Sequence, residues 1–341
     1  MLRFLHTSDL HLGKRFGQMP EDLRGRLTEA RHGALARLAA AARAAEAEAV
    51  LVAGDIFDTG TPAPATLRQA LAQMAADPAL SWVLLPGNHD SLAADELWAE
   101  AARRCPPNVT LALSPEPLAI LPGAVILPAP ATTRRPGRDL TAWMDAAPTP
   151  AGALRIGLAH GAVQSFGEDG AADVIAPDRA TRAGLDYLAL GDWHGQVRID
   201  ARTWYSGTPE PDRFKHQAPG RALLVALAGP GAAPQVTPVE TGAFAWETRR
   251  LDLLPGEDAA ARLGAALPAP AARRQTLLRL ELQGRARLAG RTALAAAIAE
   301  AAPDFPLFEV RDSALAIEPE AADLDAIDRA GALRHAAETL L

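Results

Sequence analysis

The sequence is poor in cysteine and lysine and has no long apolar run. Its single cysteine, Cys105, permits no internal disulfide bond, which fits a protein of a reducing cytoplasm. No uninterrupted apolar stretch is long enough to span a bilayer, so we expect no membrane association. Lysine occurs only as Lys14 and Lys215, and together with the abundant arginine, alanine and proline this indicates a GC-rich coding sequence rather than a function.

Length and charge narrow the class of protein further. The 341 residues are enough for one large domain and a smaller one. The net charge of -7 argues against a protein that coats nucleic acid through bulk electrostatics, but it is compatible with a nuclease whose basic contacts are local. The first motif with metal-binding side chains begins at Asp9, which leaves no room for a cleavable secretory leader before it. We therefore expect a cytoplasmic protein.

Five short apolar runs end in side chains of the kind that bind metal ions. The clearest case is residues 49–53, which predict a buried strand and lead directly into Gly54-Asp55-Ile56-Phe57-Asp58. Carboxylates that follow such strands lie in the crevice where open α/β sheets bind ligands. The other four motifs are Asp9-Leu10-His11, Gly87-Asn88-His89-Asp90, His160-Gly161 and Gly191-Asp192-Trp193-His194. One such motif alone would indicate a polar turn, but the five together indicate a two-metal site with Asp55 as the bridging carboxylate.

The residue types within the motifs favour hard metal ions. Asp9 and His11 are two residues apart, so in an extended chain both point to the same side and can hold one ion. The glycine before Asn88 allows a sharp turn that brings the amide oxygen close to an ion. Oxygen ligands of this sort suit manganese and magnesium. We expect Asp58 and Asp90 to hold neighbouring backbone or a ligand rather than to touch metal.

Several basic residues are candidates for contacts to a phosphate. They are Lys14 and Arg15 directly after the first motif, Arg134, Arg135 and Arg138 in a loop that contains proline and glycine, and Arg213 beyond the last motif. Each of them is also compatible with a solvated loop, and the sequence leaves that alternative open.

Apolar periodicity predicts alternating strands and helices along the whole chain. The strands expected before residue 245 are 2–7, 49–53, 82–85, 118–121, 124–130, 154–159 and 187–190, followed by a hairpin of 221–227 and 235–240. The helices expected there are 21–48, 64–76 and 93–104. Beyond residue 245 we expect strands at 245–253, 276–283 and 307–318 and helices at 258–267, 290–301 and 322–340, without a ligand-type cluster. This pattern predicts a catalytic domain over residues 1–244 and a capping domain over residues 245–341.

The ordered motifs resemble those of the calcineurin-like metallophosphoesterases. The segments His6-Thr7-Ser8-Asp9-Leu10-His11-Leu12-Gly13-Lys14 and Gly54-Asp55-Ile56-Phe57-Asp58 are similar, more narrowly, to the SbcD branch of DNA-repair nucleases. The resemblance covers residues 6 to about 214, and the downstream segment matches the small capping domain of that branch in position. It implies an α/β (α+β) fold, namely a two-sheet β-sandwich flanked by helices with a small C-terminal αβ capping domain.

The resemblance also implies two sets of metal ligands that share one carboxylate. The first set is Asp9, His11, Asp55 and His194. The second set is Asp55, Asn88, His160 and the residue at position 192. Two divalent cations held in this way lower the pKa of a shared water and stabilise the displaced oxygen. His89 would not bind metal but would stabilise the phosphate or protonate the leaving oxygen.

The last motif departs from the family pattern. The family has Gly-His-x-His, whereas this chain has Gly191-Asp192-Trp193-His194. An aspartate can still bind manganese, and we expect Asp192 to be a ligand of the second ion. Three carboxylates would then face two divalent ions, which favours hard ions. A metal-bound water would be less acidic than in a site with a neutral imidazole at position 192. The alternative, in which Asp192 points away and water completes the second site, stays open.

Three functions are compatible with these motifs. The leading interpretation is a manganese-dependent DNA nuclease, an exonuclease of DNA repair that works with an SbcC-type ABC ATPase; Mg²⁺ in place of Mn²⁺ and a homodimer stay open. The second is a hydrolase of small nucleotide-like phosphoesters, because this kind of centre serves many substrates. The third is a partner-binding homologue without catalysis, against which the intact Asn88 and His89 argue. A DNA enzyme requires an open groove lined by residues such as Lys14, Arg134, Arg135 and Arg213.

Overall fold

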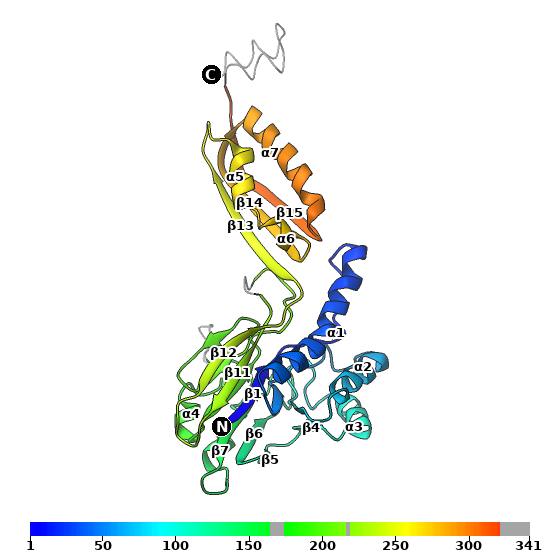
Figure 1. The fold of residues 1–341 in the computed structure, drawn as a ribbon, viewed down its shortest axis with the longest axis vertical. Coiled ribbons are helices and arrows are strands. Elements are labelled where there is room, and N and C mark those ends of the chain that lie inside the picture. The colour runs from blue at the N-terminus through cyan, green and yellow to red at the C-terminus, as the bar shows by residue number, and fades with distance from the viewer. Residues whose placement is uncertain (164–173, 216–218, 321–341) are drawn as a thin grey trace. The chain divides into compact units, whose positions relative to one another are not determined.

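The computed structural model describes residues 1–163, 174–215 and 219–320, and these form two compact units (Figure 1). The first unit comprises residues 1–212 and the described residues up to Phe244. The second comprises 213–215 and the described residues from Ala245. Within the described parts of the chain, no helix is both long enough and apolar enough to cross a membrane.

Two six-stranded sheets form the first unit. The first sheet has the spatial order β12 (Gln235–Glu240), β11 (Arg221–Leu227), β1 (Leu2–Thr7), β2 (Ala49–Val52), β3 (Ser81–Leu84) and β4 (Val109–Leu111). The second has the order β5 (Leu118–Leu121), β6 (Ala124–Ala129), β7 (Leu154–His160), β8 (Tyr187–Gly191), β10 (Thr203–Tyr205) and β9 (Val197–Arg198). Strands β1 to β4 run parallel to one another, as do β6, β7, β8 and β10. The other pairs are antiparallel: β11 with β1, β12 with β11, β5 with β6, and β9 with β10.

The parallel strands end level with one another. Thr7 at the end of β1 pairs with Val52 at the end of β2, and Val52 pairs with Leu84 at the end of β3. In the second sheet His160 pairs with Gly191. Each metal-ligand motif therefore begins at the same edge of its sheet, which is where side chains from successive parallel strands can meet.

Both faces of the sheets are buried, and the alternation of side chains explains how. In β1, Phe4 lies in a core between the two sheets, whereas Leu5 lies in a core under the helices. In β2, Leu51 and Val50 divide in the same way. The helices that pack on the first sheet are α1 (Glu21–Ala44), α2 (Pro64–Ala75) and α3 (Asp95–Arg104). The outer face of the second sheet carries η1 (Ala142–Ala146) and α4 (Arg179–Arg182). The predicted two-sheet fold flanked by helices is thus confirmed.

His6 joins the two sheets beneath the strand ends. Its Nε2–H donates to the Leu190 carbonyl oxygen at 3.1 Å, so Nδ1 is the acceptor of the Tyr187 hydroxyl at 3.0 Å. Burial lowers the pKa of His6 to about 3, so the ring is neutral. His6 is therefore a structural residue, held by hydrogen bonds from one sheet to the other.

The second unit is a three-stranded parallel sheet with helices on it. Its strands are β13 (Ala245–Leu253), β14 (Thr276–Arg287) and β15 (Leu307–Glu318), and its helices are α5 (Ala259–Ala266), α6 (Pro270–Arg273), α7 (Leu288–Ala301) and η2 (Ala302–Asp304). Leucines of the sheet, such as Leu251 and Leu280, pack against Leu263 of α5 and Leu294 of α7. The helix predicted at 322–340 lies outside the described residues.

Gly191 allows the two sheets to come together at the ligand edge. A Cβ atom at this position would lie 1.9 Å from the Ala53 carbonyl oxygen, 2.7 Å from the Ser8 Cβ and 2.8 Å from the His160 Nδ1. Ala53 and Ser8 follow strands of the first sheet, whereas Gly191 ends β8 of the second. The glycine before Asp192 is therefore required by the close approach of two backbones.

Replacing Gly191 with alanine should destabilise the first unit. The new methyl group would push the ends of β2 and β8 apart, and overpacking of this kind costs about 1–3 kcal/mol. The measurement is the urea midpoint of the apoprotein, followed by circular dichroism.

Gly25→Ala is the matched control, because Gly25 lies within α1 and a Cβ there meets no atom within 4 Å. That variant should gain about 0.5–1 kcal/mol from helix propensity. A Gly191→Ala variant as stable as the wild type would contradict the close contact.

Candidate metal centre

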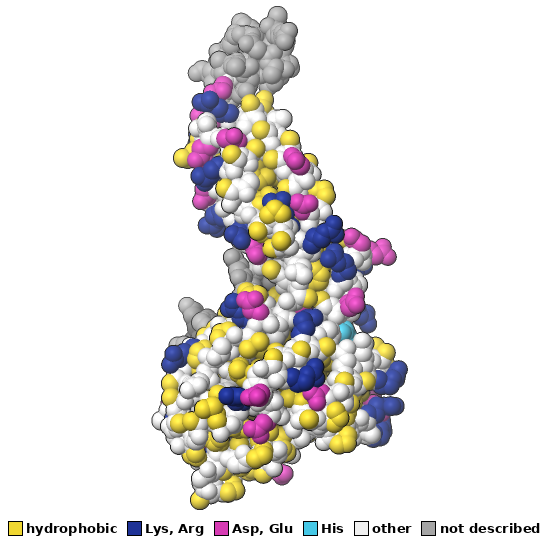
Figure 2. All heavy atoms as spheres, viewed as in Figure 1, with side chains coloured by type: hydrophobic (Ala, Val, Ile, Leu, Met, Phe, Trp, Pro, Cys, Tyr) yellow, Lys and Arg dark blue, Asp and Glu magenta, His cyan; other side chains and the backbone are white. Residues whose placement is uncertain are grey.

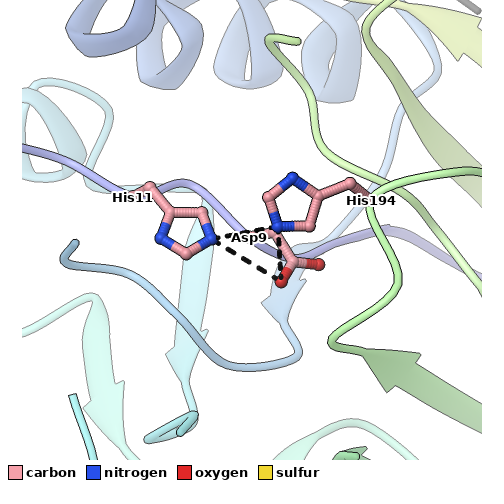
Figure 3. A group of neighbouring side chains, drawn as sticks. All are labelled: Asp9, His11 and His194. Atoms are coloured by element: carbon pink, nitrogen blue, oxygen red, sulfur yellow. Dashed lines mark hydrogen bonds and ion pairs between the residues drawn. The ribbon is translucent and has the colours of Figure 1, made fainter. Parts of the chain in front are cut away.

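Asp9, His11 and His194 converge beyond the end of β1 (Figure 3). The Nε2 atoms of the two imidazoles lie 3.2 Å apart. The Asp9 Oδ1 atom lies 4.0 Å from His11 Nε2 and 3.9 Å from His194 Nε2. These three atoms form a small triangle of nitrogen and oxygen donors, the arrangement that surrounds a divalent cation.

Carboxylates behind the two rings orient them. His11 Nδ1 lies 3.4 Å from Asp58 Oδ1, and His194 Nδ1 lies 3.4 Å from Asp212 Oδ1. A carboxylate next to Nδ1 favours the tautomer with hydrogen on that atom, so each Nε2 presents its lone pair to the centre. Two lone pairs 3.2 Å apart repel each other, and a bound cation would remove that repulsion.

Lys14 lies between the two orienting carboxylates. Its Nζ atom is 2.9 Å from Asp212 Oδ2 and 3.5 Å from Asp58 Oδ1, and its side chain is only 24% exposed. The sequence suggested a phosphate contact for Lys14. These ion pairs favour a different task, which is to hold the two carboxylates that face His11 and His194 and to offset part of their charge.

Asp55 faces both groups of predicted ligands with one oxygen. Its Oδ2 atom lies 3.7 Å from His11 Nε2 and 3.5 Å from His160 Nε2. The other oxygen, Oδ1, accepts a hydrogen bond from the His89 backbone N–H at 2.9 Å. The carboxylate is thereby fixed, with Oδ2 directed between the two sites as a bridging ligand requires.

Asn88, His160 and Asp192 gather on the second side of Asp55. His160 Nδ1–H donates to the Ala53 carbonyl oxygen at 2.8 Å, which leaves Nε2 as its ligand atom. That Nε2 lies 3.8 Å from Asp192 Oδ1, and the Asn88 amide nitrogen donates to the same Oδ1 at 3.0 Å. The Asp192 carboxylate is therefore directed toward this group, and it does not point away from it.

The charges of the group call for a cation. Burial alone would lower the pKa of His160, but the nearby carboxylates of Asp55, Asp9 and Asp192 raise it to about 9. Burial alone would raise the pKa of Asp55, but His160 and His11 outweigh this, and the net shift is downward. One protonated imidazole offsets only part of the negative charge of these three carboxylates, so the group favours a bound cation.

Unpaired buried atoms provide a test of the fit to metal. Among the buried side-chain atoms that have no hydrogen-bond partner within the described residues are Asp9 Oδ1, Asn88 Oδ1 and His160 Nε2. Unsatisfied buried polar atoms are costly and rare in folded proteins. All three belong to predicted ligands, and a pair of divalent cations would satisfy them. The residues therefore fit a two-metal site.

Backbone strain is concentrated in the same residues. Among the described residues, six that are not glycine have a positive φ, and four of these are Asp9 (54°), His11 (43°), Asp55 (56°) and Asp192 (99°). Such conformations are uncommon outside glycine and persist where the surrounding structure enforces them, often at functional sites. Each of these four residues lies within four positions of the end of a parallel strand.

His89 lies beside the centre and its ring is held from behind. Its Nδ1–H donates to the Asp58 carbonyl oxygen at 2.9 Å, and its ring centroid is 4.8 Å from that of His11. His89, His11 and Asp58 also lie close enough together to hold a metal ion. The ion pair between Asp58 and Lys14 argues against metal binding by this third group. That His89 does not bind metal stays a prediction.

Asp90 connects two of the motif loops. Its oxygens accept hydrogen bonds from the backbone N–H groups of Phe57, at 2.9 Å, and Gly87, at 2.7 Å. Burial and the neighbouring Asp55 raise the pKa of Asp90 to about 7, against the opposing effect of these two hydrogen bonds. Asp90 thus holds the loop after β2 against the loop after β3.

The other basic residues differ in their surroundings. Arg15, Arg134 and Arg135 are exposed and make no hydrogen bond or ion pair to the residues that the structure describes, whereas Arg213 belongs to the second unit. On the face of the molecule seen in Figure 2, basic and acidic side chains are intermixed.

Several supporting residues were missed in the sequence. Ser8 donates a hydrogen bond to Asp9 Oδ2 at 2.5 Å, and the Thr208 hydroxyl donates to the Asp9 backbone oxygen at 2.9 Å. Asp212, which faces His194 and Lys14, belongs to the same loop after β10 as Thr208. Only Ser8 could have been found by its place beside a ligand. Thr208 and Asp212 belong to no recognisable motif. They reach the site because β10, which precedes their loop, pairs with β8, and the sequence does not show this pairing.

Comparisons with known proteins agree with this geometry. Among curated proteins, the SbcD component of the nuclease SbcCD from Escherichia coli (strain K12) is 39% identical over 95 residues, which are 27% of this chain and 22% of that protein. The protein of the same name from Rhodobacter capsulatus is 40% identical over 94 residues, 26% of this chain and 22% of that protein. The chain thus spans about a fifth of the length of these relatives, 22% in each case. Residues 2–196, more than half of the chain, match the calcineurin-like phosphoesterase family as a whole. The chain therefore belongs to the calcineurin-like phosphoesterase family.

Proposed function

We propose that the protein is a DNA nuclease that hydrolyses phosphodiester bonds at a centre of two divalent cations. The observation that carries this proposal is the position of Asp55, whose Oδ2 atom lies 3.7 Å from His11 Nε2 and 3.5 Å from His160 Nε2. A carboxylate oxygen between two groups of ligands can serve two ions at once. Two-metal sites of this kind act on phosphodiesters by clamping the attacking and leaving oxygens.

In this proposal each cation has its own ligands besides Asp55. The first would be held by Asp9, His11 and His194. The second would be held by Asn88, His160 and Asp192. The oxygen donors among these ligands, the three carboxylates and the Asn88 amide, suit Mn²⁺, with Mg²⁺ as the alternative. When bound, such cations supply positive charge that makes an attacking water more acidic and a phosphate more electrophilic.

His89 is proposed to act on the substrate rather than on the metal. Because its Nδ1–H is engaged by the Asp58 carbonyl oxygen, Nε2 is the atom that can face a substrate oxygen. A protonated Nε2 there would donate a hydrogen bond to the phosphate and then the proton to the leaving oxygen. The hydrogen bond from its backbone N–H to Asp55 keeps the ring beside the centre.

DNA as substrate is supported by the similarity to proteins named as the SbcD component of the nuclease SbcCD. We extend that similarity to an exonuclease of DNA repair in the cytoplasm that works with an SbcC-type ABC ATPase. Residues 1–244 would carry the chemistry and residues 245–341 would form a capping domain. In the described part of 245–341, no three histidine, cysteine or acidic side chains lie together as metal ligands would.

The proposal is tested with the purified full chain and defined substrates. Linear double-stranded DNA, single-stranded DNA and bis(p-nitrophenyl) phosphate are incubated with Mn²⁺, with Mg²⁺ or with EDTA. We expect cleavage of DNA with Mn²⁺ and none with EDTA. Hydrolysis of the small diester without cleavage of either DNA would instead establish a small-phosphoester hydrolase, and no hydrolysis at all would favour a partner-binding homologue.

Asp55→Ala and His89→Ala should separate metal binding from chemistry. Asp55→Ala removes the shared ligand, so calorimetric titration with Mn²⁺ should show a larger loss of binding than for any other single ligand variant. His89→Ala should bind Mn²⁺ normally but hydrolyse phosphodiesters about 10²–10⁴-fold more slowly, the usual contribution of acid–base catalysis.

Asp95→Ala is the control for both variants, because Asp95 lies on the exposed first turn of α3. It should retain both metal binding and turnover. Normal binding of two ions by Asp55→Ala would exclude a bridging role, and loss of metal from His89→Ala would make His89 a ligand.

Asp192 should determine the properties of the second site. Asp192→Asn removes one negative charge, so the second Mn²⁺ should bind more weakly and hydrolysis should slow. Asp192→His should keep a working centre that tolerates Zn²⁺ better, because imidazole suits zinc and carboxylate suits manganese. Calorimetry and turnover with each metal measure both effects.

Asp178→Asn removes a carboxylate that is 62% exposed and serves as the matched control. Full activity and two bound ions in Asp192→Asn would mean that water completes the second site.

A further inference from the structure

A largely apolar cavity of about 570 Å³ adjoins the second group of predicted ligands. Asn88, His160 and Asp192 form part of its lining. We propose that this cavity binds the nucleobase of the nucleotide whose phosphate is attacked. The inference rests on the proposed function and deepens it, because it says which part of the substrate lies next to the metal centre and on which side.

The walls of the cavity suit a flat apolar group. They come from the loop after β6, the residues after β7, and the segment from β8 to β10. Representative wall residues are Ala131, Pro136, Val163, Trp193, Val197 and Ile199. Its volume lies in the range of cavities that hold small organic ligands, roughly 300–1,000 Å³. A nucleobase would bury its flat aromatic faces here, and all bases have such faces, so any base can bind in this way.

The polar groups of the cavity lie where the phosphate of a bound nucleotide would lie. Asn88, His160 and Asp192 provide the polar side at the metal centre, where the phosphate would lie. Arg134 also lines the cavity, is exposed, and makes no ion pair within the described residues. An arginine in this setting can contact the phosphate from outside the centre. By contrast, Arg138 lines a separate cavity, so only part of the arginine loop can serve this substrate.

The back of the cavity is rigid. Tyr205 is buried, and its hydroxyl donates to the Gly161 carbonyl oxygen at 2.7 Å. The same hydroxyl accepts a hydrogen bond from the Val163 backbone N–H at 2.8 Å. With its polar atom engaged in this way, the ring presents only apolar surface. A wall that is already ordered loses little entropy when a ligand binds.

Little in the lining can distinguish one base from another. Besides the groups assigned to the phosphate, the engaged Tyr205 and the Trp193 indole, the only polar side chain among the described residues that line the cavity is Thr133. Stacking on apolar and aromatic side chains tolerates any base. We therefore expect the cavity to favour purines modestly over pyrimidines, by area, and to have no strict sequence requirement.

The test compares two phosphate ligands that differ only in the base. Calorimetry with the Mn²⁺-loaded full chain measures binding of dAMP and of 2-deoxyribose 5-phosphate. We expect dAMP to bind about 10-fold more tightly, since one stacked base contributes roughly 1–3 kcal/mol. Equal affinities would overturn the proposal.

Variants then locate the preference. Val197→Gln should reduce the ratio of the two affinities to near 1 while leaving 2-deoxyribose 5-phosphate binding unchanged. Ile199→Gln changes a wall residue that is already 38% exposed, and it should lower the ratio even if Val197→Gln folds poorly. Arg198→Ala, between them in sequence, is the control, because Arg198 stacks on Trp204 and does not line the cavity.

A preference for dAMP that survives both glutamine variants would overturn the assignment of the cavity. Arg134→Ala should weaken both ligands alike, and a loss confined to dAMP would contradict its phosphate contact. Failure of the DNA assay together with a preference for dAMP that depends on Val197 would reject the nuclease and retain the base site. Cleavage of DNA without such a preference would do the reverse.

Discussion

The close approach of two strand ends is the constraint on which the rest of the site depends. The predicted ligands of the first sheet follow β1, β2 and β3, and those of the second sheet end β7 or follow β8. They can surround common ions only if the edges of the sheets touch. Gly191 permits this contact, since any Cβ there would collide with the Ala53 carbonyl oxygen. The hydrogen bonds of His6 to Tyr187 and Leu190 hold the sheets together just below that point.

Around this junction the protein accumulates features that are unfavourable without a cation. Buried carboxylates lie close together, predicted ligands adopt left-handed backbone conformations, and buried donor atoms lack partners among the described residues. The surrounding residues compensate for part of this cost. Lys14 forms ion pairs with Asp58 and Asp212, backbone N–H groups donate hydrogen bonds to Asp55 and Asp90, and Ser8 donates one to Asp9. The result is a centre whose predicted ligands are held by surrounding hydrogen bonds and ion pairs and whose charge favours metal binding.

Asp192, at the position where the resemblance implies a histidine, acts on the same balance of charge. Asp192 Oδ1 faces His160 and accepts a hydrogen bond from Asn88. An aspartate here therefore still offers an atom that can bind metal, and it adds negative charge. The proposed base site lies on this side of the centre, where Trp193, the neighbour of Asp192, forms part of the wall. One short segment after β8 therefore contributes both to the predicted second metal site and to the cavity beside it.

The sequence by itself determined where the strands end and which chemical groups follow them, because both are local properties. Apolar runs mark β1, β2, β3, β7 and β8, and the hairpin of β11 and β12 was predicted residue for residue. Helix α1 ends at Ala44, earlier than its periodicity suggested, because Glu46 takes a positive φ. Short elements such as β4 and β9 are below the length at which periodicity is visible. Only the tertiary structure decided the partners of Lys14, the place of Asp212 and Thr208, and the existence of the cavity. These depend on contacts between residues far apart in the chain, such as the 199 positions that separate Thr208 from Asp9, and no local pattern encodes them.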